Sequence, residues 1–563
     1  MTEPALPQPN RPDELAFVAL GGVGEIGMNL SLYGYAGRWL MIDCGITFAD
    51  DTMPGVEILM ADPAFIAERR DTLIGLVATH AHEDHIGAIP YLWPRLGCPV
   101  YATPFTAAML RRKLIEAGLE HEVPLIEVPM SGRFSIGPFE IELITLTHSI
   151  PEPNAVALRT PLGTVLHTGD WKFDPEPLVG ANYDLAALER LGDEGVLAMI
   201  CDSTNAMRPG DSGSEAAVRR ALVDLVGRCQ NRVVVACFAS NVARLESAAA
   251  AAAAHDRHVA LIGRSLWRIA QAARETGYLK DVADFLTEED AAYLPRDKVL
   301  LVCTGSQGEP RSALTRIAAD EHAHIVLEGG DTAIFSSRVI PGNERAIGRL
   351  QNALARLGVE IVTEHDHFVH VSGHPARDEL QRMYGAVRPH IAVPVHGEAR
   401  HLMAQAQLAA ECGVPQSLVT RNGEVVKLAP GPAAVIGEVP TGRLAADGKS
   451  LLDAAGETLK SRQRMTFNGA ALATIVLDGT GRLAAPPQVT FQGFGKPGDD
   501  AGDEWQRSVA EAVAALAPRE RSDDAAVREA ARIAVRRLAR AIFGKRPLVE
   551  VHVVRLPAPG RRS

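Results

Sequence analysis

The run THAHEDHIG at residues 79–87 constrains this chain most, because it brings His80, His82, Asp84 and His85 together within six residues. It follows an apolar run, residues 73–78, which predicts a buried strand. Open α/β sheets place their functional groups at the ends of such strands. Imidazole binds zinc and similar metals well, and a carboxylate adds a harder ligand. The spacing therefore predicts a metal site where a strand gives way to a loop.

Length and composition describe a globular chain of several domains. With 563 residues, about three to four domains are expected. The first dozen residues are polar and rich in proline, and no run of about 18 apolar residues occurs. We therefore expect neither a signal peptide nor a membrane span. The seven cysteines are scattered without a CxxC pair, which favours reduced thiols and a cytoplasmic location.

Charge is unevenly distributed along the chain. The net charge of −12 argues against a surface that coats polyanions generally. From Trp505 to Ser563, however, there are 13 Lys and Arg residues against 6 Asp and Glu residues. Arginines recur at every fourth position from Arg528 to Arg540, on one side of a helix expected over residues 524–543. A solvated helix face, a subunit contact and a polyanion-steering surface all fit this pattern.

A glycine pattern near the amino terminus, GVGEIG at residues 22–27, could be taken for a dinucleotide-binding loop. That loop requires a helix to begin at the third glycine. Here an alternating stretch with turn glycines follows, and then a second apolar run at residues 39–42. These features predict a β-hairpin instead.

Two further predicted strands end beside ligand-type side chains. Residues 140–145 lead to His148, and residues 163–167 lead to Asp170. A single histidine or aspartate after a strand is more often structural. Here each supplies a ligand type that a two-metal site still needs. Other strands are expected at residues 15–20, 39–42 and 196–201.

From about residue 215, helices and strands alternate, which predicts a parallel sheet with helices on its faces. The expected helices are 215–228, 242–254 and 343–357, and the expected strands are 233–238, 259–262, 299–303, 324–327, 359–362, 368–371 and 391–395. Residues 436–462, rich in Gly, Ala, Lys and Asp, are typical of a linker. A last small α/β unit is expected after it.

Taken in order, these motifs resemble the metallo-β-lactamase superfamily in its β-CASP branch, and within it the ribonuclease J family. The motifs that carry the resemblance are THAHEDHIG, the isolated His148 and Asp170, CDSTN (201–205), SGHP (372–375) and PVHGE (394–398). LGGVGEIGMN (20–29), MIDCG (41–45) and TGSQGEP (304–310) also match. The first motif is typical of the whole superfamily, whereas the later ones in this order are typical of ribonuclease J.

The resemblance implies an α/β fold in which a metallo-β-lactamase αββα sandwich carries an inserted β-CASP α/β domain and a small C-terminal α/β domain. The implied ranges are 1–214 and 372–435 for the sandwich, 215–371 for the insertion, 436–462 for the linker and 463–563 for the C-terminal domain. It also implies a cytoplasmic homodimer or homotetramer that acts on single-stranded RNA. Partners in an RNA-degradation complex are left open.

The activity implied by the resemblance is hydrolysis of RNA 5′-to-3′ from a 5′-monophosphate end, with internal cleavage as well, in mRNA decay and RNA maturation such as rRNA processing. The cofactors would be two divalent metal ions, zinc in the first place, with Mn²⁺ or Mg²⁺ as alternatives. The implied ligands are His80, His82 and His148 for the first ion, Asp84, His85 and His396 for the second, and Asp170 between them.

His374 and Asp202 match two further family positions near the metals and join Asp84 as predicted catalytic residues. We expect His374 to stabilise charge on the phosphate or to protonate the leaving oxygen, and Asp202 to orient a neighbouring side chain. The alternative is that both simply cap strand ends.

A pocket for the 5′-phosphate and the RNA backbone is predicted at two tight turns, because backbone N–H groups and hydroxyls there suit phosphate. The predicted residues are Ser240, Asn241, Ser372 and Gly373, with His374 beside them. The alternative for the first turn is that Ser240 or Asn241 only begins the helix at Val242.

Three other functions compete with RNA hydrolysis. A small-molecule metallo-β-lactamase-type hydrolase would share the metal motif but would need neither the insertion nor a further domain. A DNA-processing β-CASP nuclease would share both, so only a comparison of DNA with RNA separates it. A non-enzymatic RNA-binding subunit is disfavoured by the complete set of ligands.

Overall fold

The computed structural model describes residues 13–50, 52–494 and 501–557. The chain forms two compact units, the first comprising Met1–Thr47 and Met60–Gly442, the second Phe48–Leu59 and Arg443–Ser563. Among the helices of these described residues, none combines the length and the apolar character that a membrane crossing requires.

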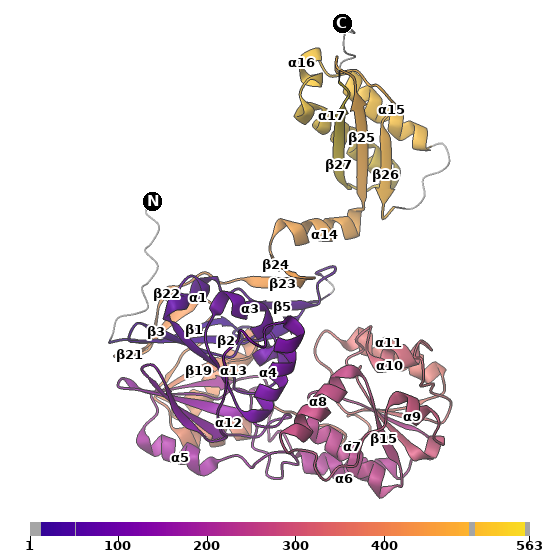
Figure 1. Ribbon diagram of the computed structural model, residues 1–563. Helices are drawn as coiled ribbons and strands as arrows, with labels where there is room; N and C mark the ends of the chain where they lie inside the picture. Colours follow the sequence, from indigo (N-terminus) through magenta and orange to yellow (C-terminus); the bar gives the residue numbers. More distant parts are fainter. Residues whose placement is uncertain (1–12, 51, 495–500, 558–563) are drawn as a thin grey trace. The chain divides into compact units, whose positions relative to one another are not determined.

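The first unit contains two large sheets that pack face to face (Figure 1). The first sheet has the order β22 (Ala434–Glu438), β21 (Glu424–Ala429), β1 (Leu15–Gly21), β2 (Leu30–Tyr35), β3 (Arg38–Ile42), β6 (Leu73–Val77), β7 (Val100–Ala102) and β8 (Leu125–Glu127). The second has the order β20 (Gln416–Ser417), β19 (Ile391–Val395), β13 (Ala198–Asp202), β12 (Gly163–His167), β11 (Asn154–Thr160), β10 (Phe139–Thr145) and β9 (Arg133–Ile136). Fully buried side chains such as Phe17, Leu40, Val156 and Val393 fill the space between them.

Helices cover the outer faces of both sheets. Packed along the first sheet are α1 (Ala64–Ala67), α3 (Ile89–Leu96) and α4 (Pro104–Ala117). A second core holds α5 (Leu185–Glu194), α12 (Arg377–Val387) and α13 (Ala399–Glu411) on the other sheet. The result is a four-layer αββα sandwich. The hairpin expected after the glycine pattern is confirmed, because β1 pairs antiparallel with β2 and β2 with β3.

Between β13 and α12 the chain builds a separate lobe, which we call the inserted lobe (residues 203–376). Its sheet is parallel throughout, in the order β15 (His258–Ile262), β16 (Val299–Cys303), β14 (Val233–Ala236), β17 (Thr332–Phe335) and β18 (Glu360–Val362). Its larger helices are α6 (Glu215–Val226), α7 (Val242–Ala254), α8 (Arg264–Glu275) and α11 (Glu344–Arg356). The predicted α/β class, with a sandwich and an inserted parallel sheet, is confirmed.

Two of the strands predicted in this lobe are wrong. Residues 324–327 are irregular, although Ile325 and Leu327 are buried in the core, and the strand that joins the sheet is β17. Residues 368–371 are also irregular. Here side chains, not a neighbouring strand, bond the backbone: Arg244 and Ser336 both donate hydrogen bonds to the carbonyl of Val369. A short apolar run indicates burial, but it does not distinguish a strand from an irregular segment.

The buried carboxylate of Glu379, on α12, fixes the two chain segments that connect the sandwich with the inserted lobe. It accepts hydrogen bonds from the backbone N–H of Ser212 on the outgoing segment (2.8 Å) and of Ala376 on the returning one (2.8 Å). It also accepts one from the N–H of Phe173 in the sandwich (2.9 Å). A carboxylate with three backbone donors holds its neighbours firmly, so both connections start from a defined position.

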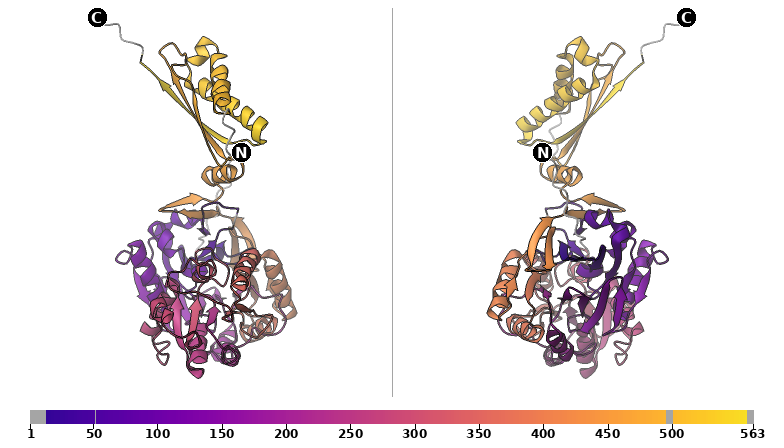
Figure 2. Two further views of the ribbon diagram at one scale, coloured as in Figure 1. Left: turned by 90° about the vertical axis from the view of Figure 1, so that its right-hand side faces the viewer. Right: turned by 90° about the vertical axis from the view of Figure 1, so that its left-hand side faces the viewer.

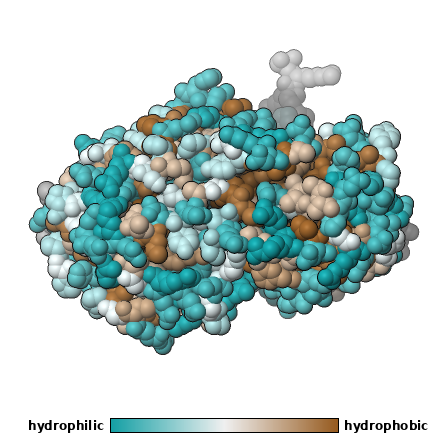
Figure 3. Space-filling view, turned by 90° about the horizontal axis from the view of Figure 1, so that it is seen from below, coloured by the Kyte–Doolittle hydropathy of each residue, from teal (hydrophilic) through white to brown (hydrophobic). Residues whose placement is uncertain are grey.

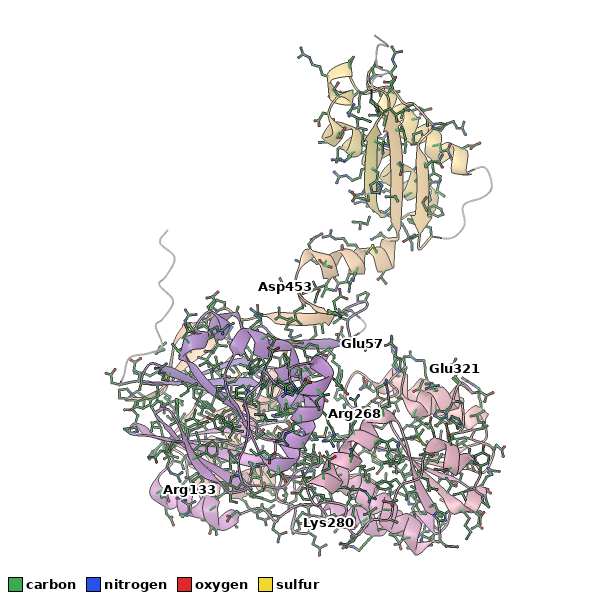
Figure 4. The ribbon with its side chains drawn as sticks, viewed as in Figure 1. Glu57, Arg133, Arg268, Lys280, Glu321 and Asp453 are labelled. Atoms are coloured by element: carbon green, nitrogen blue, oxygen red, sulfur yellow. The ribbon has the colours of Figure 1, made fainter. Side chains whose placement is uncertain are left out.

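A second attachment joins α4 of the sandwich to α8 of the inserted lobe, which lie side by side (Figure 1). Figure 2 shows the same ribbon from two further sides. Arg268, labelled in Figure 4, pairs with Glu116 at 2.5 Å, and Arg112 pairs with Glu275 at 2.7 Å. The face shown in Figure 3 is mainly hydrophilic, with apolar residues in small groups. The two ion pairs between α4 and α8 are partly exposed, so each is expected to contribute little to stability.

The second unit is built from two distant parts of the chain. One sheet has the order β24 (Ser450–Asp453), β23 (Arg443–Asp447), β5 (Ile58–Ala61) and β4 (Ile46–Phe48). A three-stranded sheet of β26 (Gln488–Gln492), β25 (Ala470–Leu477) and β27 (Leu548–Arg555) is covered on one face by α15 (Ala501–Ala514) and α17 (Asp524–Phe543) (Figure 1). Thus residues 436–462, expected as a linker, carry β23, β24 and the start of α14 (Glu457–Asn468).

Candidate metal centre

The first four ligand-type residues lie where the sequence predicts, directly after β6. His80 and His82 occupy the loop that follows the strand, and Asp84 and His85 lie in the short helix α2 (Glu83–Ile86). Helical backbone turns successive side chains by about 100°. The loop and the helix together therefore let four adjacent side chains face a common centre.

The other side chains come from neighbouring strands of the second sheet. His148 follows β10, Asp170 follows β12, Asp202 ends β13, and His396 follows β19. Because β12, β13 and β19 run parallel side by side, their carboxyl ends meet at one edge. Residues more than 200 positions apart are thereby brought together.

One group consists of His80, His82, His148 and Asp170, whose ligand atoms all lie within 4.8 Å of one another. His82 Nδ1 lies 3.1 Å from His80 Nε2 and 3.0 Å from His148 Nε2. The Asp170 Oδ2 atom lies 3.9 Å from His80 Nε2 and 3.8 Å from His148 Nε2. Three ring nitrogens and one carboxylate oxygen thus surround a single point.

A second group of Asp84, His85, Asp170 and His396 shares the same carboxylate, again with ligand atoms within 4.8 Å. Asp170 Oδ2 lies 3.2 Å from His85 Nε2, and Asp170 Oδ1 lies 3.6 Å from His396 Nδ1. Asp84 Oδ2 lies 3.1 Å from His396 Nε2. Asp170 therefore stands between the two groups.

The donor atoms fit a pair of divalent ions. Asp170 Oδ1 is buried and has no hydrogen-bond partner among the residues that the structure describes. A buried carboxylate oxygen without a partner is costly unless a cation satisfies it. Three nitrogens with one oxygen in one group, and two of each in the other, are ligand sets that zinc and related metals accept. The residues present are therefore compatible with divalent metal binding.

Neighbouring side chains hold the rings in place. Asp43 Oδ2 lies 2.7 Å from His85 Nδ1, while its Oδ1 accepts a hydrogen bond from the Thr79 N–H (2.8 Å). The carbonyl of Gly373 lies 2.5 Å from His148 Nδ1, and a Cβ at that glycine would come within 2.6 Å of the same ring. Such partners fix the tautomer and the orientation of a metal-binding imidazole.

Burial and charge move the histidine pKa values in opposite directions. Burial lowers the pKa of all three histidines of the first group, that of His82 to about 4. Burial also disfavours protonation of His85 and His396, but Asp170 and the neighbouring carboxylates outweigh it and raise the pKa of both rings. The first group is thus neutral at pH 7, which is the form that binds metal.

His374 and Asp202 lie beside this cluster and contact each other. His374 Nδ1 is 2.8 Å from Asp202 Oδ2, while Asp202 Oδ1 accepts a hydrogen bond from the Thr204 hydroxyl (2.7 Å). The Thr204 hydroxyl also lies 2.9 Å from His396 Nδ1. Asp202 and His374 form a third overlapping group with Asp170 and His396. Both oxygens of Asp202 are satisfied by hydrogen bonds, which suits an orienting role.

The four residues of the predicted phosphate pocket occupy two places. Ser372 and Gly373 lie at the cluster, where Ser372 Oγ accepts a hydrogen bond from Asn205 Nδ2 (2.8 Å). Ser240 and Asn241 lie in the turn between β14 and α7, and among the described residues no hydrogen bond joins them to Ser372 or Gly373. Asn241 Oδ1 caps α7 by accepting from the N–H of Arg244 (2.9 Å), so Asn241 does begin the helix, while its place in the phosphate pocket stays a prediction. Its amide nitrogen takes no part in that cap.

Several residues of the site were not singled out from the sequence. Asp43 belongs to the MIDCG motif and Asn205 to CDSTN, so their motifs were noted without a role for these side chains. Each supports a functional residue 42 to 169 positions away. No local periodicity reveals such a pairing, because only the folded chain brings the two residues together.

Known protein families match most of the chain. Residues 24–228 match the metallo-beta-lactamase superfamily, and residues 230–354 match the family described as Ribonuclease J, beta-CASP domain. Residues 343–418 match a Zn-dependent metallo-hydrolase RNA specificity domain, and residues 457–556 match the Ribonuclease J C-terminal domain.

Relatives and a solved structure agree with these matches. A protein named Ribonuclease J from Sinorhizobium meliloti is 46% identical over 97% of this chain and 98% of its own length. One of the same name from Mycolicibacterium smegmatis is 40% identical over 98% of this chain and 100% of its own. A crystal structure of a protein of unknown function from Enterococcus faecalis shares the fold, with a TM-score of 0.53 at 17% identity over 74% of this chain and 100% of that one. This chain therefore belongs to the ribonuclease J family and is a metal-dependent ribonuclease.

Proposed function

We propose that this protein hydrolyses single-stranded RNA 5′-to-3′ from a 5′-monophosphate end and also cuts RNA internally, in RNA maturation, rRNA processing and mRNA decay. The observation that carries the proposal is the carboxylate of Asp170 standing between two groups of histidines and carboxylates. Support for RNA as substrate comes from the matched RNA specificity domain and from relatives named Ribonuclease J.

The proposed ligands are the seven residues of the two groups, with His80, His82 and His148 on one side, Asp84, His85 and His396 on the other, and Asp170 in common. Zinc is the proposed metal, with Mn²⁺ or Mg²⁺ as alternatives. Two divalent ions bound there would stabilise the charge of a phosphodiester and activate water for attack.

His374 is proposed to act on the phosphate or on the leaving oxygen. Its Nδ1 is engaged with Asp202, which holds the ring, and no hydrogen bond to Nε2 is found among the described residues. Burial disfavours protonation of His374, but the carboxylates of Asp202 and Asp170 together outweigh it and raise the pKa of His374. A ring that is protonated near neutral pH can donate a proton to the departing oxygen or a hydrogen bond to the phosphate.

The 5′-phosphate pocket is proposed at Ser240, Asn241, Ser372 and Gly373. Backbone N–H groups in turns and at the start of a helix favour an anion. α7 begins at Val242, so the turn before it provides such groups. The hydroxyl of Ser372 and the ring of His374 lie at the metal cluster and would contact the first phosphodiester.

The remaining proposals concern the whole protein. We propose the domain ranges 1–214 with 372–435, 215–371 and 463–563, a cytoplasmic location, and assembly as a homodimer or homotetramer, with RNA-degradation partners as a further expectation. Helices cover one face of the C-terminal sheet. The other face exposes the apolar side chains of Leu472 and Val554. This uncovered face is where we propose that the subunits meet.

The proposal is tested by digesting one internally labelled RNA that carries a 5′-monophosphate or a 5′-triphosphate, with wild type, His80→Ala and His121→Ala. His121 is 94% exposed and serves as the matched control. We expect rapid release of mononucleotides from the monophosphate RNA by wild type and the control, and none from His80→Ala. Internal fragments alone, independent of the 5′ end, would contradict the proposed 5′-end pocket. Cleavage of the same sequence as DNA but not as RNA would favour a DNA-processing nuclease.

A further inference from the structure

Arg338 lies at the carboxyl edge of the inserted sheet. It follows β17 by three residues, on the same edge as the turn that carries Ser240 and Asn241 after β14. Carboxyl edges of parallel sheets are where ligands bind in α/β folds. Arg338 is exposed, whereas Ser336 and Ser337 before it are buried.

The buried side chain of Gln307 fixes the backbone around Arg338. Its Nε2 donates to the Arg338 carbonyl (2.9 Å), and its Oε1 accepts from the N–H of Ile340 (2.9 Å). Gln307 itself belongs to the glycine-rich turn after β16. A buried amide bonded on both sides gives its partners a defined position, so Arg338 is presented by a rigid support.

The guanidinium of Arg338 is connected to the metal centre through one side chain. Its Nη1 donates to Asn205 Oδ1 (3.1 Å). The Nδ2 of Asn205 donates in turn to Ser372 Oγ (2.8 Å) and to the carbonyl of His374 (3.1 Å). Asn205 is itself buried. A single amide therefore joins Arg338 to Ser372 of the proposed phosphate pocket and to His374 beside it.

The charge of Arg338 is uncompensated within the described part of the chain, where no carboxylate lies within ion-pair distance of it and its one side-chain partner is a neutral amide. A guanidinium has five N–H donors in a planar fork, and this one uses a single donor. The fork matches a phosphate, which it binds through two parallel hydrogen bonds. In a chain of net charge −12, a free cation held beside the active centre indicates an anionic ligand.

We propose that Arg338 is the cationic wall of the 5′-end pocket and that it binds the terminal monophosphate of the RNA. The inference rests on the proposed function, in which Ser240, Asn241, Ser372 and Gly373 offer only neutral donors to the terminal phosphate. A terminal monophosphate carries nearly two negative charges at pH 7 and a 5′-hydroxyl carries none. Arg338 thereby makes the enzyme distinguish these two ends.

The test compares kcat/KM on two RNAs of one sequence, one with a 5′-monophosphate and one with a 5′-hydroxyl, for wild type, Arg338→Gln, Arg338→Lys and Arg356→Gln. Arg356 is an exposed arginine at the far end of α11 and controls for loss of one charge in the same lobe. We expect Arg338→Gln to lower the monophosphate-to-hydroxyl ratio about 10- to 100-fold, the range for a charge-assisted hydrogen bond. The ratio for Arg338→Lys should lie between those of wild type and Arg338→Gln, and Arg356→Gln should keep the wild-type ratio.

Thermal unfolding of each variant distinguishes a binding effect from a folding effect. Arg338→Gln should unfold within about 2 °C of wild type, because only an exposed side chain with one neutral partner is changed. If wild type prefers the monophosphate and Arg338→Gln keeps that preference, or loses activity on both RNAs equally, the assignment of Arg338 is wrong while the proposed function stands. If wild type itself shows no preference, the end pocket and the role of Arg338 fail together.

Discussion

At the scale of single residues, Asp43 illustrates how one carboxylate positions a metal ligand. Its backbone has φ +61°, and its two oxygens bind the ring of His85 and the N–H of Thr79. Asparagine tolerates this left-handed backbone as aspartate does, so Asp43→Asn changes the charge and leaves the loop intact. The neutral amide supports the imidazole less well as a metal ligand.

We expect Asp43→Asn to weaken metal binding about 10- to 100-fold, as loss of a carboxylate behind a histidine ligand usually does. The affinity is measured by titrating zinc into the metal-free protein against a competing chelator. Asp71→Asn, at an exposed position, is the control and should bind metal as wild type does. An unchanged affinity of Asp43→Asn would show that His85 does not depend on this carboxylate for binding.

At the scale of helices and strands, the site residues differ in whether the sequence alone can reveal them. His80, His82, Asp84 and His85 are found from spacing, because a strand followed by a loop and a short helix is local. His396 is reached only through the resemblance, since its distance to Asp84 depends on β19 lying in the second sheet. Residues 324–327 were mispredicted because an irregular buried segment needs the same apolar side chains as a strand.

Helix α7 makes a prediction that separates the two roles of Asn241. Aspartate caps a helix as well as asparagine does, but it places a negative charge where the phosphate is proposed to bind. Asn241→Asp should therefore unfold at nearly the wild-type temperature while its preference for 5′-monophosphate RNA falls about 10-fold. Asn241→Ala, which removes the cap, should cost about 1 kcal/mol of stability. If Asn241→Asp keeps the full preference, Asn241 serves the helix alone.

At the scale of the whole molecule, the second unit depends on residues that precede most of the first. Val56 and Leu59 form one apolar cluster with Ala445 and Leu459, 386 positions separating Leu59 from Ala445. No strand or helix was predicted over residues 48–59, and no local pattern in the sequence links them to residues 445–459. The C-terminal unit therefore cannot be removed by cutting the chain at one place.

This arrangement predicts that Leu459→Ala loosens a segment far away in the sequence. Leu459 is buried at 1% exposure, and its truncation should cost about 2–3 kcal/mol of the stability of that cluster. Limited proteolysis with peptide mapping should then show new cleavage within residues 48–59. Leu472→Ala, at an exposed position, should leave that segment resistant. Cleavage confined to residues after 443 would show that residues 48–59 are held independently.

The late position of His396 has a consequence during protein synthesis. The strand pair of β1 with β21 joins Leu15 to Ala429, so the first sheet closes only when most of the polypeptide has been translated. At about 5–20 residues per second, roughly 15 to 60 s separate the emergence of His85 from that of His396. Throughout that interval the nascent chain on the ribosome holds the HxHxDH motif without the last proposed ligand. A ribonuclease ordered in this way does not yet have its complete centre while the message that encodes it is being read.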